Sequence, residues 1–497
     1  MALIGVSNLT FAYEGSYTNI FTDVSFQIDT DWKLGFCGRN GRGKTTFLRL
    51  LMGQLEYSGS ISASVSFEYF PFAVEDNEQD TMDILSSIAP DAKKWQIQKE
   101  LSNLAVDEDA LRRPFVTLSN GEQTKALLAG LFLRENNFLL IDEPTNHLDM
   151  AARKTVARYL NGKRGFILVS HDRAFLDECV DHILSINRDN IEVMHGNFST
   201  WWEQKKLRDA SELAQNERLE NEIGRLKDAA ARTARWSDKV ERSKTKPLKS
   251  GLSADKGYIG HNAAKMMKRS KATEKRRQDA VDERSTLLKN IEETESLKIH
   301  PLTYHSPRLL YLENVSVAYD SRAVFRDLSF SLQRGERVAI IGGNGSGKSS
   351  ILKLICGEDI PYTGAVTVGS RLTISYVPQD ASFLTGSLND FAQEQGIDET
   401  LFKAILRKLD FSRVQFEKDM RDFSAGQKKK TLIAASLCNK AHVYIWDEPL
   451  NYIDVLSRIQ IEVLLKTYNP TMLFVEHDRV FCDNVATKKV DLAGITS

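Results

Sequence analysis

The pattern of apolar and polar residues predicts the same series of elements near both ends of the chain. Near the N-terminus an alternating run, VSFQI, precedes an apolar run, KLGFCG, then a glycine-rich loop and a helical pattern, TTFLRLLMG. The order returns after residue 327 as LSFSL, RVAIIGG, a second glycine-rich loop and SSILKLICG. Buried strands that alternate with helices predict an α/β domain with a largely parallel sheet.

The middle of the chain has a different pattern, which predicts two long helices. In 203–240 an apolar stripe recurs at helical spacing, and a second such stripe falls in 263–298. An antiparallel helical hairpin is the expected arrangement. Between the helices lies KTKPLKSGLSADKGYIGHN (244–262), whose proline and glycines predict an irregular tip. The stripes consist of Leu219, Ile223, Leu226 and Ala230, and of Ala280, Arg284, Leu287 and Ile291.

Several motifs occur twice in the same order, which indicates a tandem duplication. GRNGRGKTT returns as GGNGSGKSS, LSNGEQ as FSAGQ, LLIDEPTNHLD as VYIWDEPLNYID, and LVSHD as FVEHD. We therefore expect an α/β protein of two tandem domains, 1–200 and 301–497, joined by a helical linker, 201–300.

Length and composition exclude several classes of protein. A chain of 497 residues is too long for one ordinary core. The sequence has no apolar run long enough to span a membrane, and its start does not resemble a signal peptide. Five scattered cysteines indicate reduced thiols, neither a disulfide framework nor a metal site. We expect a cytoplasmic protein with no membrane partner.

The net charge of −1 conceals a basic segment. Between Arg232 and Arg277 there are 15 Lys or Arg and 4 Asp or Glu, a balance of 15 − 4 = +11, so the remainder carries −12. A basic segment on an acidic protein predicts a polyanionic partner for that segment alone.

The glycine-rich loops have the G-x-x-x-x-G-K-[ST] pattern, in which backbone N–H groups surround phosphates. Lys44 and Lys348 are expected to reach the outer phosphates, and Thr45 and Ser349 to offer a hydroxyl to Mg²⁺. A single match could be a chance loop, but two copies in the strand–loop–helix context favour ATP. The predicted phosphate-binding residues are Gly38, Asn40, Gly41, Gly43, Lys44, Thr45, Thr46, Gly342, Asn344, Gly345, Gly347, Lys348, Ser349 and Ser350.

Two carboxylates end each of the apolar strands LLIDEP and VYIWDEP. Asp142 and Asp447 suit the Mg²⁺ shell, and Glu143 and Glu448 suit a catalytic role towards the attacking water. The alternative is that these acids only cap the next helix. His171 and His477 follow later strands and are expected to contact the γ-phosphate, although a single histidine there is more often structural. Ser119, Gly121, Ser424 and Gly426 precede helices whose N-termini are predicted to face an anion.

This set of motifs resembles the ATP-binding cassette family. The resemblance implies two cassettes closing head to tail around two ATP molecules. One composite site pairs Lys44, Glu143 and His171 with Ser424 and Gly426; the other pairs Lys348, Glu448 and His477 with Ser119 and Gly121. The resemblance further implies that Tyr13 and Tyr319 stack on adenine, although both could simply be half-buried strand residues. Each site is expected to hydrolyse ATP.

Two departures from the family pattern predict unequal sites. The Q-loop glutamine, a further expected Mg²⁺ ligand, is present as Gln379, but Phe72 stands at its place in the first copy. TNHLD also becomes LNYID in the second copy. We expect different hydrolysis rates, without an indication of which site is slower.

The basic tip suits a deep, negatively charged target, and RNA fits best. The alternative is a solvated coiled coil with an ordinary loop. The residues expected to contact RNA are Lys244, Lys246, Lys249, Lys256, Tyr258, His261, Lys265 and Arg269.

The junction MHGNFSTWWEQKK (194–206) resembles the ABC-F family, and the whole chain resembles its Lsa-type resistance proteins. That resemblance implies a protein that enters the tRNA exit site of the 70S ribosome. There it perturbs P-site tRNA or 23S rRNA near the peptidyl transferase centre. The expected result is protection against lincosamides, pleuromutilins and streptogramin A. By the same resemblance, Phe198, Trp201 and Trp202 anchor the base of the linker. Because both cassettes are on one chain, we expect a monomer.

Three alternatives remain open. A housekeeping ABC-F translation factor usually carries a shorter linker and an extra arm in its first cassette, and 72–117 is too short for that arm. A soluble ATPase subunit of a drug exporter leaves the basic tip unexplained. A DNA-maintenance ATPase with a coiled coil would divide one cassette, whereas both are complete here.

Overall fold

The computed structural model describes residues 2–15, 19–146, 148–187, 190–243, 256–286, 297–319 and 322–492. The chain divides into two compact units, and each is described by itself. The first comprises Met1–Asn187, Ile191–Ser199 and Thr294–Ser497 and contains both predicted cassettes. The second comprises Arg188–Asn190 and Thr200–Glu293 and contains the predicted linker.

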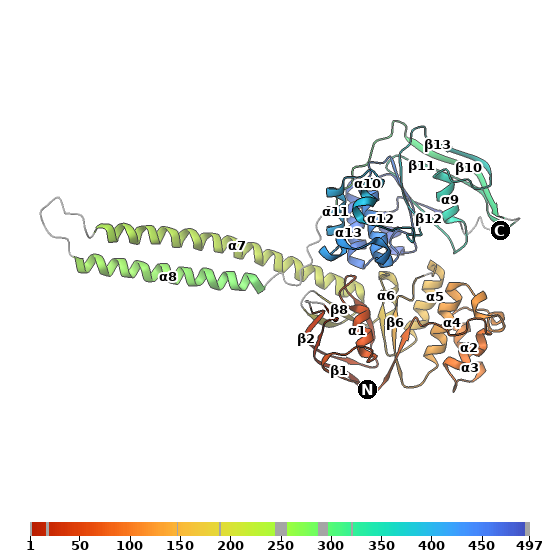
Figure 1. The fold of residues 1–497 in the computed structure, drawn as a ribbon, viewed down its shortest axis with the longest axis horizontal. Helices are drawn as coiled ribbons and strands as arrows, with labels where there is room; N and C mark the ends of the chain where they lie inside the picture. The colour runs from red at the N-terminus through yellow and green to blue at the C-terminus, as the bar shows by residue number, and fades with distance from the viewer. Residues whose placement is uncertain are drawn as a thin grey trace. The chain divides into compact units, whose positions relative to one another are not determined.

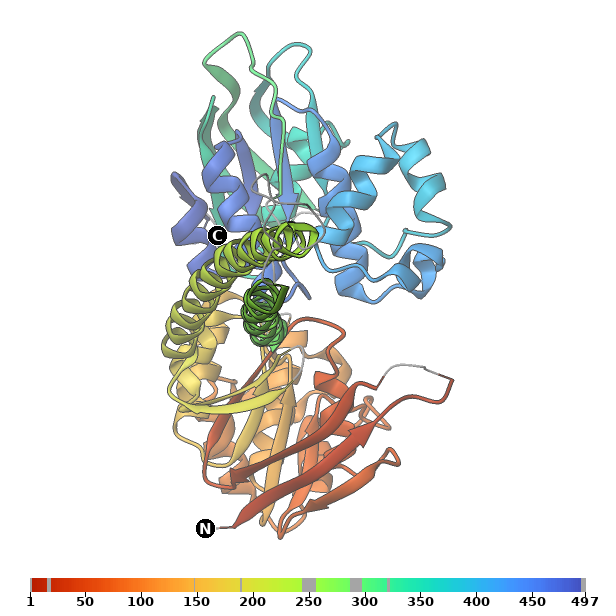
Figure 2. The same ribbon diagram turned by 90° about the vertical axis from the view of Figure 1, so that its left-hand side faces the viewer.

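The N-terminal cassette is built on two sheets (Figures 1 and 2). An antiparallel sheet has the order β2 (Phe21–Asp29), β1 (Leu3–Phe11), β4 (Ser58–Ser62). The larger sheet has the order β5 (Ser66–Phe70), β6 (Asn137–Asp142), β7 (Phe166–Val169), β3 (Lys33–Cys37), β8 (His182–Ile186), β9 (Ile191–His195). Its neighbours are parallel except β8 and β9. The helices are α1 (Lys44–Leu51), α2 (Thr81–Ile88), α3 (Lys94–Asn103), α4 (Asn120–Phe132), α5 (Met150–Asn161) and α6 (Arg173–Cys179), with 3₁₀ turns at Glu108–Arg112 and Phe115–Thr117.

The C-terminal cassette repeats this plan. Its antiparallel sheet has the order β11 (Arg322–Gln333), β10 (Arg308–Tyr319), β13 (Tyr362–Val368). Its parallel sheet has the order β14 (Ile374–Val377), β15 (Val443–Asp447), β16 (Met472–Val475), β12 (Arg337–Ile341), β17 (Lys488–Asp491). The helices are α9 (Lys348–Ile355), α10 (Leu388–Glu394), α11 (Glu399–Lys408), α12 (Ala425–Cys438), α13 (Val455–Tyr468) and α14 (Arg479–Val485), with 3₁₀ turns at Arg413–Glu417 and Met420–Asp422.

The core of each cassette explains why the loop after the central strand is fixed in place. Phe47 and Leu48 of α1 are fully buried against residues of both sheets, including Val6 of β1 and Phe36 of β3. Ile351 and Leu352 occupy the matching positions in α9. Because the first turn of each helix follows the glycine-rich loop directly, this packing holds the loop at the edge of the sheet.

The second unit is an antiparallel pair of helices (Figure 1). Helix α7 (Phe198–Ser243) has its less exposed positions along the predicted stripe, and Leu219 is 6% exposed. Arg284 of α8 (Lys256–Thr286) donates from Nε to Asn216 Oδ1 at 3.0 Å and forms an ion pair with Glu220. These contacts join the two helices, so Leu219, Ala280 and Arg284 lie where an antiparallel hairpin requires.

The predicted start and end of the second linker helix, 263 and 298, are both wrong. Helix α8 begins at Lys256, so Gly257 and Gly260 lie within its first turns and part of the expected irregular tip is helical. A glycine there costs only about 1 kcal/mol, which the rest of a long helix offsets. The described residues from Leu297 onward are not helical: Leu297 and Ile299 enter the core of the C-terminal cassette, and His300 precedes Pro301, which disfavours helix. Residues 244–255 and 287–296, with Leu287 and Ile291, lie outside the described part of the chain.

The predicted fold class is confirmed: an α/β protein with two tandem cassettes and a long helical hairpin in the segment between them.

Candidate functional site

Both glycine-rich loops end in the same backbone conformation. Gly43 and Gly347 have φ angles of 95° and 87°, in the left-handed region that favours glycine, and they form the N-caps of α1 and α9. Each helix then begins at its loop lysine, Lys44 or Lys348. The first N–H groups of a helix have no intrahelical partner, so this geometry presents them to an anion.

The loop lysines lie folded onto their own loops. Lys44 Nζ donates to Gly38 O at 2.7 Å, and Lys348 Nζ donates to Gly343 O at 2.7 Å. Burial lowers the pKa of both ammonium groups, and nearby carboxylates oppose this effect. Each ammonium is therefore placed at the centre of a backbone cradle, where a phosphate would replace the loop carbonyls as its partner.

The strand-end carboxylates occupy matching positions. Asp142 is the last residue of β6 and Asp447 the last of β15. The next residues, Glu143 and Glu448, have positive φ angles of 52° and 46°. Such a conformation is uncommon for residues other than glycine and is often found at functional sites. It turns both glutamates away from the strand direction, at the edge of the sheet where α1 or α9 begins.

One of the predicted composite sites surrounds a cavity of about 1080 Å³ between the cassettes. The C-terminal cassette contributes Lys348, Glu448 and His477, and the N-terminal cassette contributes Ser119 and Gly121. A cross-cassette hydrogen bond lies beside the cavity: the Asn344 N–H donates to Asp149 Oδ2 at 3.3 Å. The cavity is slightly larger than the roughly 300–1,000 Å³ that is typical of small-molecule sites. We refer to this site as site B. Other lining residues are Tyr319, Gly345, Gly347, Ser349, Ser350 and Gln379.

The residues of the other composite site, site A, meet around Asn40. Its Nδ2 donates to the Tyr452 carbonyl of the opposite cassette at 2.8 Å, and its Oδ1 lies 3.0 Å from His171 Nε2. Gly426 is also adjacent, because a Cβ atom there would lie 3.2 Å from Asn40 Nδ2 and 2.5 Å from the Tyr452 carbonyl. The structure thus brings the loop of Lys44 and His171 to the helix that Ser424 precedes.

Ser119 and Ser424 have the same local role. Each is the N-cap of the following helix, α4 or α12, and its hydroxyl accepts a hydrogen bond at 3.3 Å from the backbone N–H three residues later. The side chains of Glu122 and Gln427 return a hydrogen bond and complete a capping box. These caps fix the N-termini of α4 and α12, and the binding of an anion there stays a prediction.

Glu143 and Glu448, the two glutamates predicted to be catalytic, have opposite electrostatic environments. Burial and the adjacent Asp142 raise the pKa of Glu143 to about 8. Burial also acts on Glu448, but hydrogen bonds from His477 and Gln379 outweigh it and hold the pKa of Glu448 at about 2. The distances from the glutamate Oε1 to the histidine Nε2 are alike, 3.3 Å in site A and 3.2 Å in site B. Gln379, whose Nε2 donates to Glu448 Oε2 at 3.0 Å, is therefore one source of the difference.

The residues predicted to hold Mg²⁺ fit a divalent cation differently in the two sites. Asp447 is 1% exposed, and its carboxylate oxygens have no partner in good hydrogen-bond geometry among the described residues, although the Ser349 hydroxyl is close enough to lower its pKa. Burial raises its pKa to about 6, and a bound cation would favour the charged form. Asp142 instead accepts hydrogen bonds at Oδ2 from Thr45 Oγ1 at 3.0 Å and from the Tyr69 hydroxyl at 2.9 Å. When bound, Mg²⁺ held by these residues would supply positive charge that offsets the charge of the phosphates.

Sequence reasoning missed Tyr69, although a signal was present. Tyr69 and Tyr376 hold matching places two residues before the prolines of EYFPF and SYVPQ. Only a fold in which β5 pairs with β6 places Tyr69 beside Asp142. Burial, followed by the Asp142 charge, raises the pKa of the Tyr69 hydroxyl, so it remains a hydrogen-bond donor.

Tyr13 and Tyr319 also occupy matching places. The hydroxyl of Tyr13 lies 3.0 Å from Thr46 Oγ1, and the hydroxyl of Tyr319 lies 3.1 Å from Ser350 Oγ. Their side chains are 42% and 43% exposed. The rings thus lie next to the start of α1 and α9 with exposed surface, and stacking on adenine remains a prediction.

The family model for ABC transporter domains matches residues 21–146 and 325–451. The Bacillus subtilis (strain 168) ribosome protection protein VmlR is 30% identical over 493 residues, which cover 96% of this chain and 85% of VmlR. This chain is an ABC-F family protein. The Escherichia coli (strain K12) energy-dependent translational throttle protein EttA is 27% identical over 526 residues, covering 95% of this chain and 89% of EttA. A crystal structure of the archaeal ribosome recycling factor aABCE1, in complex with stalk protein aP1, matches with a TM-score of 0.66 and 18% identity over 97% of this chain and 87% of that chain.

Membership of this family makes the ABC-F protein an ATP hydrolase with two sites, as predicted. No helix among the described residues is long and apolar enough to cross a membrane.

The predicted RNA contacts of the ABC-F protein are only partly described. Helix α8 contains Lys256, Tyr258, His261, Lys265 and Arg269, and the last three are exposed. Lys244, Lys246 and Lys249 lie outside the described residues.

Proposed function

We propose that this ABC-F protein binds the 70S ribosome in its ATP-bound state and protects it from antibiotics that act at the peptidyl transferase centre. Cassette closure around ATP and Mg²⁺ would permit docking at the tRNA exit site. The helical hairpin would then perturb P-site tRNA or 23S rRNA near the drug, and hydrolysis would release the protein. We propose lincosamides, pleuromutilins and streptogramin A as the drug classes, and a cytoplasmic monomer as the acting form.

The observation that carries this proposal is the concentration of exposed positive charge on α8. From 256 to 277 the sequence has eight Lys or Arg and one acidic residue, Glu274. Lys265, Lys268, Arg269 and Lys271 are all exposed. Basic side chains on a helix bind phosphates without sequence selectivity, which suits an rRNA or tRNA backbone. The name of VmlR, a ribosome protection protein, supports the same conclusion.

A purified translation system tests the proposal directly. The protein is added to ribosomes inhibited by a lincosamide, and synthesis of a reporter is measured. We expect wild type to restore synthesis, and Lys265→Ala with Arg269→Ala to restore much less while basal ATPase is unchanged. Glu203→Ala with Glu217→Ala, on α7, is a matched control without loss of positive charge. Equal rescue by wild type and by the α8 variant would contradict the role of the basic helix.

The same translation system distinguishes a resistance protein from the main alternative, a housekeeping translation factor. A translation factor resembling EttA in activity would change the yield of synthesis without any drug. A resistance protein changes it only when the drug is present.

A further inference from the structure

The contact between the two cassettes is asymmetric, although the elements that form it are repeated. Helices α5 and α13 follow the sequences TNHLD and LNYID, and helices α6 and α14 follow the two His-Asp pairs. In this repeat Arg173 corresponds to Arg479 and Glu462 corresponds to Ala157. The arginine is therefore kept in both copies, whereas its acidic partner is present in only one.

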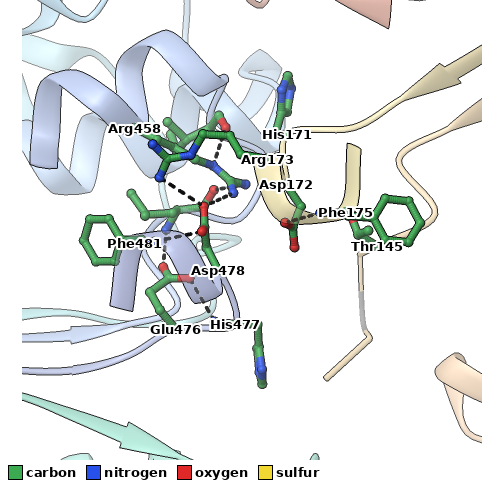
Figure 3. Close-up of polar contacts among 12 residues, drawn as sticks. Thr145, His171, Asp172, Arg173, Phe175, Arg458, Glu476, His477, Asp478 and Phe481 are labelled. Carbon is green, nitrogen blue, oxygen red and sulfur yellow. Dashed lines mark hydrogen bonds and ion pairs between the residues drawn. The ribbon is translucent and has the colours of Figure 1, made fainter. Parts of the chain in front are cut away.

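On the side of site A, the arginine and the acid form a buried ion pair across the cassettes. Arg173 of α6 pairs with Glu462 of α13, and the two side chains are 10% and 7% exposed. Arg173 Nη2 also lies 3.8 Å from Asp478 Oδ2. Figure 3 shows Asp478 between Arg173 and Arg458, with which it also forms an ion pair. Asn484 Nδ2 donates to Glu462 Oε2 at 3.2 Å. Both carboxylate oxygens of Glu462 are thus engaged.

On the side of site B, the corresponding place is a second cavity of about 330 Å³. Ala157, Glu178 and Arg479 line it, and so does His477 of site B. In the described part of the chain the ion-pair partner of Arg479 is Asp483 of its own helix, at 3.7 Å, and the Arg479 side chain is 70% exposed. On this side, Arg153 donates a hydrogen bond across the cassettes to the His477 carbonyl, and the Asn344 N–H donates to Asp149.

The consequence for opening follows from the hydrogen bonds between these charges. Separating Arg173 from Glu462 would break hydrogen bonds between a guanidinium and a carboxylate, which are stronger than those between neutral groups. Separating Arg479 from Ala157 breaks no such hydrogen bond. The sequence positions connect these contacts to the sites, because Arg173 lies two residues after His171 and Glu462 lies on the helix that follows Tyr452.

We infer that Arg173 and Glu462 are a positioning pair that keeps site A assembled, so that the cassettes separate first at site B and nucleotide exchanges there faster. Site A then acts as the hinge side of the interface. The inference requires ATP binding at two composite sites and does not depend on the ribosome, so it goes beyond the proposed function and can fail or succeed independently of it.

Nucleotide release from the full chain tests the inference. Two reporter backgrounds isolate the sites: Lys348→Ala leaves site A to bind nucleotide, and Lys44→Ala leaves site B. Each protein is loaded with fluorescent ADP and chased with excess ATP in a stopped-flow instrument. We expect release from site A to be at least tenfold slower than from site B. Equal rates in the two backgrounds would overturn the inference.

Substitutions of the pair then test its cause. Glu462→Leu with Arg173→Met removes both charges and leaves no buried charge unpaired. We expect it to accelerate release from site A about tenfold and to change release from site B less than twofold. The reciprocal variant, Ala157→Glu, supplies the missing carboxylate opposite Arg479 and is expected to slow release from site B.

Two further outcomes are decisive because they separate positioning from general stability. If the double variant accelerates both sites equally, or changes neither while its thermal unfolding matches wild type, the pair has no positioning role. If Ala157→Glu prevents folding, the variant Glu462→Leu with Arg173→Met still tests the inference. Apolar residues of similar size commonly replace buried ion pairs without loss of fold.

Discussion

Gln379 donates a hydrogen bond to Glu448 at 3.0 Å, and the first cassette has Phe72 at the matching position. This contact helps to keep Glu448 ionised, with a pKa of about 2, whereas burial raises the pKa of Glu143 to about 8. At neutral pH the Glu448 carboxyl is therefore charged, whereas the raised pKa of Glu143 favours its protonated form.

Removing these carboxylates should change thermal stability in opposite directions. The pKa of Glu143 is raised on folding, so its ionisation in the unfolded chain costs stability progressively from about pH 4.5 to 8. Glu143→Gln should thus raise Tm relative to wild type, by a few degrees and more at pH 8 than at pH 5. Scanning calorimetry across this pH range measures the difference, and a constant difference would contradict the pKa shift.

Glu448 has the reverse linkage. Its pKa is lowered on folding, so its contribution to stability is present above about pH 4.5 and is lost as the pH falls towards 2. Glu448→Gln should lower Tm at pH 7 by the equivalent of about 1–3 kcal/mol, because it disturbs hydrogen bonds to a charged group. The difference in Tm between the variant and wild type should become smaller below pH 4.5. A Tm of Glu448→Gln above that of wild type at pH 7 would contradict these hydrogen bonds.

Exchanging the residues at the Q-loop position should shift the pKa values of the two glutamates in opposite directions. Gln379→Phe removes the amide donor from Glu448 and should raise the pKa of that carboxyl. In the Lys44→Ala background we measure the pH–rate profile of site B. The apparent pKa of its acid limb should rise by at least half a pH unit. Phe72→Gln in the Lys348→Ala background is the matched test of site A and should shift that profile downward.

The Tyr69 hydroxyl should affect the Mg²⁺ requirement of site A alone. Tyr69→Phe removes one hydrogen bond to Asp142 and leaves that carboxylate freer to bind a cation. In the Lys348→Ala background, the Mg²⁺ concentration for half-maximal ATPase should fall two- to fivefold. Tyr376→Phe in the other background is the control, because no hydrogen bond from Tyr376 to Asp447 is formed among the described contacts.

Gly426 should tolerate no side chain. A Cβ atom would lie 2.5 Å from the Tyr452 carbonyl, so Gly426→Ala should separate the cassettes at site A and lower its ATPase at least tenfold. Gly224, in α7, has no atom within 4 Å of its Cβ position. Gly224→Ala should leave ATPase unchanged and stabilise the helix by about 1 kcal/mol. Full activity of Gly426→Ala would show that the contact is not needed for closure.

Most of the fold can be predicted from the sequence, because the duplication identifies the repeated domain. Each motif occurs in the same order twice, and the period of the apolar residues identifies the strands and helices around Lys44 and Lys348. Contacts between distant segments were not predictable. Tyr69 meets Asp142 only through strand pairing, and the Arg173–Glu462 pair requires the docking of two cassettes.

The end of the second linker helix was mispredicted because tertiary packing overrides the local pattern. Helical spacing alone extends it to Lys298, but Leu297 and Ile299 have a place in the C-terminal core, and tertiary packing decides in favour of that place. At the other end, Gly257 and Gly260 lower helix propensity too little to exclude the first turns of α8.

The central claim is that the ATP-bound form binds ribosomes, and the most direct measurement is sedimentation of a trapped variant. Glu143→Gln with Glu448→Gln should bind ATP without hydrolysing it and remain closed. In a sucrose gradient of cell extract with ATP, we predict that this variant migrates with 70S ribosomes and that Lys44→Ala with Lys348→Ala does not. Recovery of the trapped variant at the top of the gradient, or only with membranes, would contradict the claim.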